Sequence, residues 1–456
     1  MMRPALRARA AALALCAVLS AASCARTSPP SAPTSTVGPG VATPAHTAAA
    51  PATPLPPSEL LQQAQSLYDL GRIDDAAGEL RALLQARVAA PGGDALLLLG
   101  RCELQRGAHA AATTALQSFI AAYPADPRLP EAQFWLGEAL AGQGLGAEAA
   151  IAYRACLAQR PLLAAYVQAR IGKVLAQAGD HAGAVAAFRA AAEAETDAVR
   201  RADDLERLAA SLLALQRTPE AVAAYDEILS FARNDDYRAQ VLSKAADALA
   251  EAGDEQGAAA RRRELVEKHP ESGYAAEALS ELDAAGDAPL DAITRARVLH
   301  GAGRYQEALT LLQGYIQQHP QEHGGSAHYY AALALRRLER HRDAQREWEA
   351  LSLGHPEDPL ALEAGYQQAE ELALLNAVDD AAAAFQQFAA DHAGEERAVQ
   401  ALWRAAEVFE DSGRSWDASA AYLHAAQTYP QASYAADARF RAGLVHYLQG
   451  AVQTAA

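Results

Sequence analysis

A repeat with a period close to 37 residues runs through most of this chain and constrains its fold more than any other feature. Turn-forming residues, here termed turn markers, identify the repeat: Gly71, Gly107, Gly144, Gly179, Gln216, Gly253, Gly303, Glu339, Asn376, Gly413 and Gly450. Their spacing is 35 to 37 residues, except for one 50-residue step from Gly253 to Gly303. A period of this length is typical of units that each contain two helices.

Small residues recur at fixed distances from the turn markers. Alanine stands five residues after every marker, and alanine or glycine stands seven residues before it. Nine residues after, several repeats carry an aromatic residue: Tyr153, Phe188, Tyr225, Trp348, Phe385 and Tyr422. Seventeen residues after, six carry a proline: Pro124, Pro161, Pro270, Pro320, Pro356 and Pro430. This pattern predicts helical hairpins that cross closely at small residues and end at proline.

One hairpin cannot bury its own apolar face, so successive hairpins must stack on one another. We therefore predict an all-α fold, an α-solenoid of about eleven helical hairpins. The segments GRYQEALTLLQGYIQQHP and GRSWDASAAYLHAAQTYP resemble the second halves of tetratricopeptide repeats, and the resemblance extends from about Ser58 to the end. The long period resembles variant repeats of bacterial envelope proteins. We expect a first sub-array at 58–285 and a second at 286–456, with the last hairpin incomplete and an extra helix or bend near 283–291.

A second, weaker resemblance concerns the segments DAAGDAPLDAITRARVLHGAGRY and ALWRAAEVFEDSGR. They are similar to the superhelical N-terminal region of soluble lytic murein transglycosylases, which cleave peptidoglycan with a glutamate next to a serine and a downstream G-L-M-Q stretch. The only methionines here are Met1 and Met2, and Glu271 followed by Ser272 is interpreted as a repeat feature. We expect no enzyme in the chain as given. The alternative is the non-catalytic part of a transglycosylase whose catalytic domain lies beyond residue 456.

The N-terminus has the pattern of an export signal. Arg3, Arg7 and Arg9 precede an apolar run at 10–22, so residues 1–23 are predicted to be a signal peptide. LSAASCA resembles a bacterial lipoprotein box with Cys24 as the lipidated residue, and ordinary signal cleavage nearby is the alternative. Residues 24–57 form a Pro/Ala/Thr-rich linker. These features predict a membrane-anchored lipoprotein of the cell envelope, on its periplasmic or extracytoplasmic face.

Charge and local motifs limit the partners. A net charge of -17 argues against nucleic acid and leaves membrane contact to the N-terminal anchor alone. The segment HPQEH at 319–323 fits a zinc-binding pattern, but Pro320 and the glycines at 324–325 interrupt the helix that this pattern requires, so no metal or cofactor is predicted. The arginines at 261–263 are interpreted as a solvated face, with a docking patch for an acidic partner as the alternative. Cys102 and Cys156 are interpreted as core residues.

A ligand groove is predicted on the second half of the repeat. Ten residues before the last four turn markers stand Tyr329, Tyr366, Trp403 and Phe440, and Phe134 has the same position earlier. The family resemblance implies that this position lies near the ligand-facing side, where rings contact a peptide or a glycan strand. Arg336, Arg337, Glu407 and Glu410 would supply polar contacts. The alternative is that the rings fill space between hairpins. The predicted function is a scaffold for a protein, peptide or peptidoglycan partner.

Overall fold

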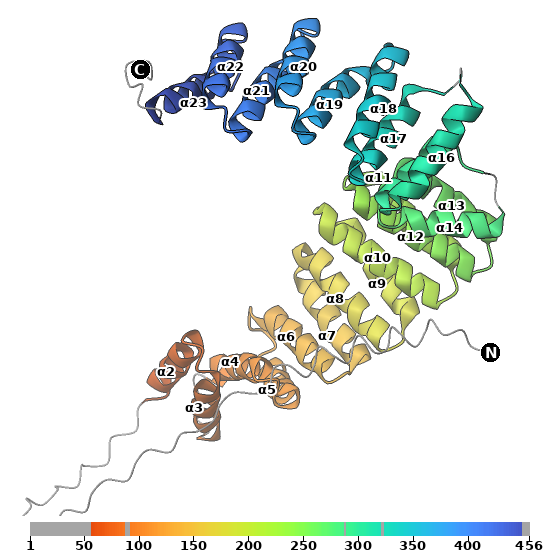
Figure 1. Ribbon diagram of the computed structural model, residues 1–456. Coiled ribbons are helices and arrows are strands. Elements are labelled where there is room, and N and C mark those ends of the chain that lie inside the picture. The colour runs from red at the N-terminus through yellow and green to blue at the C-terminus, as the bar shows by residue number, and fades with distance from the viewer. Residues whose placement is uncertain (1–55, 87–91, 287–288, 321–322, 449–456) are drawn as a thin grey trace, which may run out of the picture. The chain divides into compact units, whose positions relative to one another are not determined.

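The computed structural model describes residues 56–86, 92–286, 289–320 and 323–448. These residues form twenty-two α-helices, and no strand occurs among them. Each helix packs against the next one along the chain, as Figure 1 shows. The prediction of an all-α array of helical hairpins is therefore confirmed. Within the described ranges, no helix is both long enough and apolar enough to cross a membrane.

Ten pairs of helices form complete hairpins. The first five are α2 (Pro57–Asp69) with α3 (Ile73–Gln85), α4 (Gly92–Gln105) with α5 (His109–Ala122), α6 (Leu129–Gly142) with α7 (Gly146–Gln159), α8 (Ala164–Gln177) with α9 (His181–Ala194), and α10 (Ala198–Ala214) with α11 (Thr218–Phe231). The next five are α12 (Asp235–Glu251) with α13 (Glu255–Lys268), α15 (Ala292–Gly301) with α16 (Tyr305–Gln318), α17 (Gly325–Arg337) with α18 (His341–Gly354), α19 (Ala361–Leu374) with α20 (Val378–Asp391), and α21 (Glu396–Asp411) with α22 (Ser415–Thr428). Outside these pairs are α14 (Ala275–Ala285), α23 (Ala435–Leu448) and the short 3₁₀ helix η2 (Pro161–Leu163).

Each described turn marker ends the first helix of its hairpin in the left-handed conformation. The seven glycines have φ between 72° and 83°, and Gln216, Glu339 and Asn376 have φ of 58° or 59°. The next residue closes the turn: the amide of Arg340 donates to the carbonyl of Leu335 at 2.9 Å. This bond satisfies a carbonyl that the helix end leaves free. Glycine predominates at this position because it has no Cβ to clash there.

Small residues lie where the two helices of a hairpin cross. All ten described alanines at the position five after the marker, from Ala76 to Ala418, have 0 % exposure. On the first helix, a Cβ added at Gly137 would lie 2.5 Å from Cε1 of Tyr153. A Cβ added at Gly172 would likewise lie 2.7 Å from Cδ1 of Phe188. The predicted close crossing, with a large side chain against the small one, is thus confirmed.

The six prolines lie where the sequence places them, each two residues beyond the end of a second helix, as Pro320 follows α16. Cys102 and Cys156 are buried free thiols, as predicted. The first helix begins at Pro57, one residue before the predicted start at Ser58. The predicted signal peptide, Cys24, and the linker up to residue 55 lie outside the described residues, as does the segment after α23.

The 50-residue step contains the additional helix α14. Its residues Leu279 and Leu282 are buried in one core cluster with Leu265 of α13 and Val298 of α15. The helix also changes the environment of Arg262, whose side chain is only 11 % exposed and pairs with Glu281 of α14. The prediction of a solvated face is therefore wrong for Arg262. An acidic helix that the repeat pattern does not contain covers this side chain. The proposed division into two sub-arrays stays a prediction.

Candidate functional site

The rings predicted to line the groove, here termed the ladder rings, pack against rings of the second helices. Ring centroids are 5.2 Å apart for Tyr329 and Trp348, 5.2 Å for Tyr366 and Phe385, 5.0 Å for Trp403 and Tyr422, and 5.6 Å for Phe134 and Tyr153. Each pair has the same separation in sequence, as from 329 to 348. Each of these four hairpins thus has an aromatic pair at the same position, where its two helices cross. Part of each ladder ring contributes to the hairpin interior.

The exposure of the ladder rings differs from repeat to repeat. Tyr366 is 8 % exposed, whereas Phe440 on α23 is 70 % exposed. Tyr329 and Trp403 are half-buried. Guanidinium groups also lie over two of the rings, with Arg397 4.6 Å from the centroid of Tyr366 and Arg441 5.0 Å from that of Trp403. The rings therefore differ in the surface that they offer to a ligand.

A hollow beside Trp403 brings together three of the predicted groove residues. This hollow, here termed the Trp403 hollow, has a volume of about 290 Å³. It is lined by Tyr366, Gln400, Trp403, Arg404, Glu407 and Tyr434. The four residues from α21 have the spacing i, i+3, i+4 and i+7, so they share one face of the helix. That spacing is the sequence signal that would have added Gln400 and Arg404 to the prediction.

Arg404 is the central charged group of this region. Its Nε donates to Glu370 Oε1 at 3.0 Å and its Nη1 to Glu407 at 3.3 Å. Burial raises the pKa of the Tyr366 phenol to about 12, and the nearby Glu370 contributes. Burial also raises the pKa of Tyr434 to about 12. Both phenols therefore stay protonated at neutral pH, and the Tyr434 hydroxyl donates to the carbonyl of Val399.

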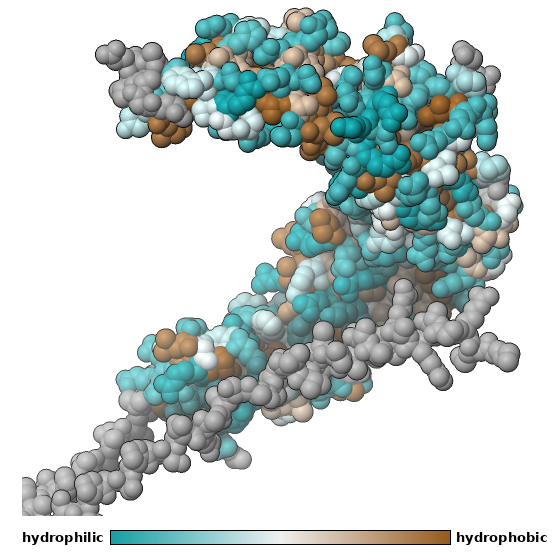
Figure 2. Space-filling view, viewed as in Figure 1, coloured by the Kyte–Doolittle hydropathy of each residue, from teal (hydrophilic) through white to brown (hydrophobic). Residues whose placement is uncertain are grey.

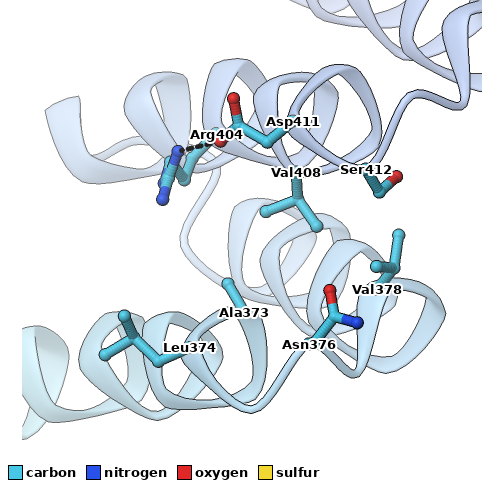
Figure 3. Close-up of a pocket in the computed structure, with 8 residues that line it drawn as sticks. All are labelled: Ala373, Leu374, Asn376, Val378, Arg404, Val408, Asp411 and Ser412. Atoms are coloured by element: carbon cyan, nitrogen blue, oxygen red, sulfur yellow. Dashed lines mark ion pairs between the residues drawn. The ribbon is translucent and has the colours of Figure 1, made fainter.

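Arg404 also lines a second hollow, between α19, the turn into α20, and α21 (Figure 3). Its volume is about 230 Å³. In Figure 3, Arg404 and Asp411 extend from the same helix, and the groups are paired at 3.6 Å. Val408 and Val378 form apolar parts of the wall. Arg404 thus lines both small hollows, and its guanidinium is already paired with acidic side chains.

The other predicted polar residues lie apart from the Trp403 hollow. Arg336 pairs with the buried carboxylate of Glu371, and Arg337 is exposed on α17. Glu410 accepts a hydrogen bond from Arg441 at 2.8 Å and one from the Tyr422 hydroxyl. Of the predicted polar set, only Glu407 lines the hollow.

The largest cavity described is one that sequence reasoning missed. On the face in Figure 2, apolar side chains form small separate groups within a mainly hydrophilic surface. The cavity has a volume of about 820 Å³ and lies between the start of α10, the end of α11 and the start of α12. Its lining, here termed the apolar cavity, consists of Ala198, Val199, Ala202, Asp203, Glu206, Phe231, Ala232, Arg233, Asn234 and Tyr237.

Local sequence explains why the apolar cavity forms here. The helices α10 and α12 have 17 residues, whereas most others have 14. Their N-caps are Asp197, whose side chain accepts from the amides of Val199 and Arg200, and Asn234, whose side chain accepts from Tyr237. The proline that follows most second helices is absent after α9 and α11, the second helices that precede α10 and α12. Longer first helices without that proline are the signal that would have marked this site.

The edge of the apolar cavity is polar and ordered by hydrogen bonds. The Tyr237 hydroxyl donates to Glu206 Oε1 at 2.8 Å, and burial, with this bond, raises the pKa of Tyr237. The guanidinium of Arg201 lies 5.1 Å from the ring centroid of Phe231. Val199 is 80 % exposed at the opening. An apolar floor with a polar edge is the arrangement found at protein-binding surfaces.

Comparison with known proteins agrees with this architecture. Residues 61–127 and 114–164 match the family model described as tetratricopeptide repeat. A comparison with curated proteins finds no match.

Several solved structures are similar to the chain. A chain of Naa15/Naa10 bound to HypK-THB has 14% identity over 87% of this chain and 67% of that one, with a TM-score of 0.37. PilF of Pseudomonas aeruginosa has 19% identity over 49% of this chain and 97% of its own, with a TM-score of 0.31. A thermophilic TPR protein from Thermus thermophilus has 24% identity over 43% of this chain and 100% of its own, with a TM-score of 0.26.

These TM-scores are all below 0.5, so the assignment depends on the family model and on the repeat itself. The matched residues cover the hairpins from α2 to α7, and the same turn geometry and buried alanines recur as far as α22. The family-model match shows tetratricopeptide repeats in residues 61–164, and the same helical-hairpin repeat continues as far as α22.

Proposed function

We propose that this chain is an exported, lipid-anchored scaffold that binds a segment of a protein partner at the apolar cavity. The observation that carries the proposal is the size and lining of that cavity. Ligand pockets in proteins have volumes of roughly 300–1,000 Å³. The apolar cavity, at about 820 Å³, is within this range, whereas the Trp403 hollow, at about 290 Å³, is just below it.

The chemistry of the lining favours a peptide with an apolar anchor side chain. Val199, Phe231 and Ala202 supply apolar contacts, and Glu206 and Asn234 supply polar atoms at the edge. Burial of one large apolar side chain stabilises a complex by about 1.5–3 kcal/mol, so the cavity is a suitable central contact. Solenoid proteins present such contacts along consecutive repeats.

The Trp403 hollow is proposed as a second contact for the same partner. Trp403 offers an indole that is half-buried, and Gln400 and Glu407 flank it. A ring with polar neighbours suits a peptide and also a sugar face, so peptidoglycan is the alternative ligand here. Export and lipidation of Cys24 would place both contacts in the cell envelope.

The proposal is tested by photo-crosslinking in cells. A photoreactive amino acid at Val199, which is 80 % exposed and lines the cavity, is expected to capture a protein partner in a discrete band. The control is the same amino acid at Leu353, which is 73 % exposed on α18 and lines none of the described cavities. Equal capture at both positions, or none at Val199, contradicts the proposal.

Peptidoglycan binding is measured separately by co-sedimentation with purified sacculi. Loss of sedimentation in Trp403→Ala, with helicity retained, would assign the glycan to the Trp403 hollow. If a protein is crosslinked at Val199 and the chain does not co-sediment with sacculi, the scaffold binds a protein partner and not peptidoglycan.

A further inference from the structure

Three histidines from two segments of the chain meet at the start of α17. His323 lies in the loop between α16 and α17, His328 in the first turns of α17, and His355 directly after α18. Their potential ligand nitrogens all lie within 4.8 Å of one another. Ring centroids are 4.9 Å apart for His323 and His328, and 5.0 Å apart for His323 and His355.

A carboxylate orients one of these rings. The Nδ1 atom of His328 lies 2.7 Å from Oε2 of Glu347 on α18, and the two side chains are only 12 % and 21 % exposed. When a carboxylate accepts the proton of Nδ1, the lone pair of the ring is on Nε2. Histidines that bind metals usually have such a carboxylate partner, which sets the tautomer and the ring orientation.

A second observation concerns His323. Its Nδ1 atom is buried and has no hydrogen-bond partner among the described residues. Buried polar atoms in native proteins are nearly always satisfied, and an unsatisfied one calls for a ligand or water. The other two histidines of the cluster carry lone pairs suited to the same ligand.

The cluster is specific to this repeat. The position of His355 after the second helix also holds histidine in other repeats, at His269, His319 and His392. The position of His328, eleven residues before the turn marker, is histidine in no other repeat. His319, the first histidine of HPQEH, does not belong to the cluster. Packing of α17 and α18 therefore assembles a histidine set that differs from the linear motif.

We propose that His323, His328 and His355 together bind one divalent first-row transition-metal ion, with Zn²⁺ as the reference ion, and that Glu347 orients His328. Three imidazoles suit Zn²⁺ and leave a fourth position for water. Zn–N bonds of about 2.0 Å place the nitrogens of a tetrahedral site about 3.3 Å apart. Side-chain rotations that move each nitrogen by about 1 Å therefore complete the site. The ion would tie the loop before α17 to the end of α18.

The test uses untagged full-length protein and Zn²⁺ or Co²⁺ alone. Titration calorimetry is expected to show one high-affinity Zn²⁺ per chain, and Co²⁺ is expected to give the intense visible absorption of a tetrahedral or five-coordinate site. His328→Gln and His355→Gln are each expected to weaken binding at least tenfold. Glu347→Gln is expected to weaken it about 10–100-fold, because it removes the orienting carboxylate.

The matched control is His392→Gln, which changes the equivalent position after α20 and is expected to leave binding unchanged. Circular dichroism at 222 nm establishes that each variant is folded. The proposal is overturned if the wild-type chain binds no Zn²⁺. It is also overturned if the triple variant His323→Gln, His328→Gln, His355→Gln, folded by this criterion, binds Zn²⁺ with unchanged stoichiometry and affinity.

Discussion

The indole Nε1 of Trp348 donates to the fully buried carboxylate of Glu371 at 3.3 Å, across the boundary between two hairpins. Glu371 on α19 also contacts His341 Nδ1 at 2.9 Å and accepts a hydrogen bond from Arg336. Donors from α17 and α18 thus meet one acceptor of the next hairpin. Neighbouring repeats are joined here by polar contacts in addition to apolar packing.

Glu371→Ala is expected to destabilise this boundary by about 3 kcal/mol, because it leaves Arg336 and the Trp348 indole without their acceptor. Hydrogen exchange is the appropriate measurement, since repeat arrays open locally and not always as one unit. Exchange should accelerate in α18 and α19. The control is Glu349→Ala, which removes an exposed glutamate of α18. Equal exchange in both variants would refute the assigned role.

Asp204 makes stability depend on pH in an unusual direction. Burial, with the charge of Asp203 next to it, raises the pKa of this carboxyl to about 6, above its usual value near 3.8. Between these two pH values the folded state therefore binds more protons at Asp204 than the unfolded state does. The contribution of Asp204 to the free energy of unfolding is thus most favourable below pH 4 and falls as the pH rises through 6.

Asp204→Asn is accordingly expected to raise stability by about 2 kcal/mol at pH 7.5 and to have little effect at pH 4. Denaturant unfolding at the two pH values measures the difference. The exposed Glu193→Gln serves as control and should show no such dependence. A variant that is less stable than wild type at pH 7.5 would show that the ionised carboxylate is stabilising.

The three turn markers that are not glycine carry a conformational cost. Glu339 has φ of 59°, in a region that costs a side chain about 1–2 kcal/mol. Glu339→Gly is therefore expected to raise stability by about 0.5–1 kcal/mol after the entropy cost of glycine. Gly303→Ala, at the equivalent turn with φ of 74°, should lower it. The apparent urea midpoint of each variant measures the effect, and a shift in the same direction for both would be inconsistent with this explanation.

Much of the fold was predictable because each repeat specifies its own hairpin. The turn at Gly253, the buried Ala258 and the helix end before Pro270 all follow from residues close in sequence. The surroundings of Arg262 were not predictable, because Glu281 belongs to an additional helix outside the repeat pattern. The 50-residue step in the repeat predicts an extra helix or bend near 283–291, but it does not specify which side chains that helix contacts.

The site was only partly predictable. Trp403 and Tyr366 have the same offset from their turn markers and line one hollow, but that offset does not determine exposure, and Phe440 is far more exposed than Tyr366. The apolar cavity depends on two longer helices whose N-caps are Asp197 and Asn234. Its shape arises from packing between neighbouring repeats and not from any single motif.

Lipidation of Cys24 is tested by labelling cells with an alkyne fatty acid. The expected result is a labelled protein in the membrane fraction, because an acyl chain on Cys24 anchors the exported chain. Cys24→Ser should lose both the label and the membrane association. An unlabelled wild-type protein that fractionates like the Cys24→Ser variant would instead support ordinary signal cleavage.

The central claim, that a protein segment binds in the apolar cavity, is tested most directly by hydrogen exchange of the full chain with and without the partner captured at Val199. Bound partner is expected to protect residues 198–206 and 231–237, and Val199→Asp is expected to weaken its affinity at least tenfold without loss of helicity. Tight binding by the partner with no protection of these two segments, and with unchanged affinity in Val199→Asp, would contradict the claim.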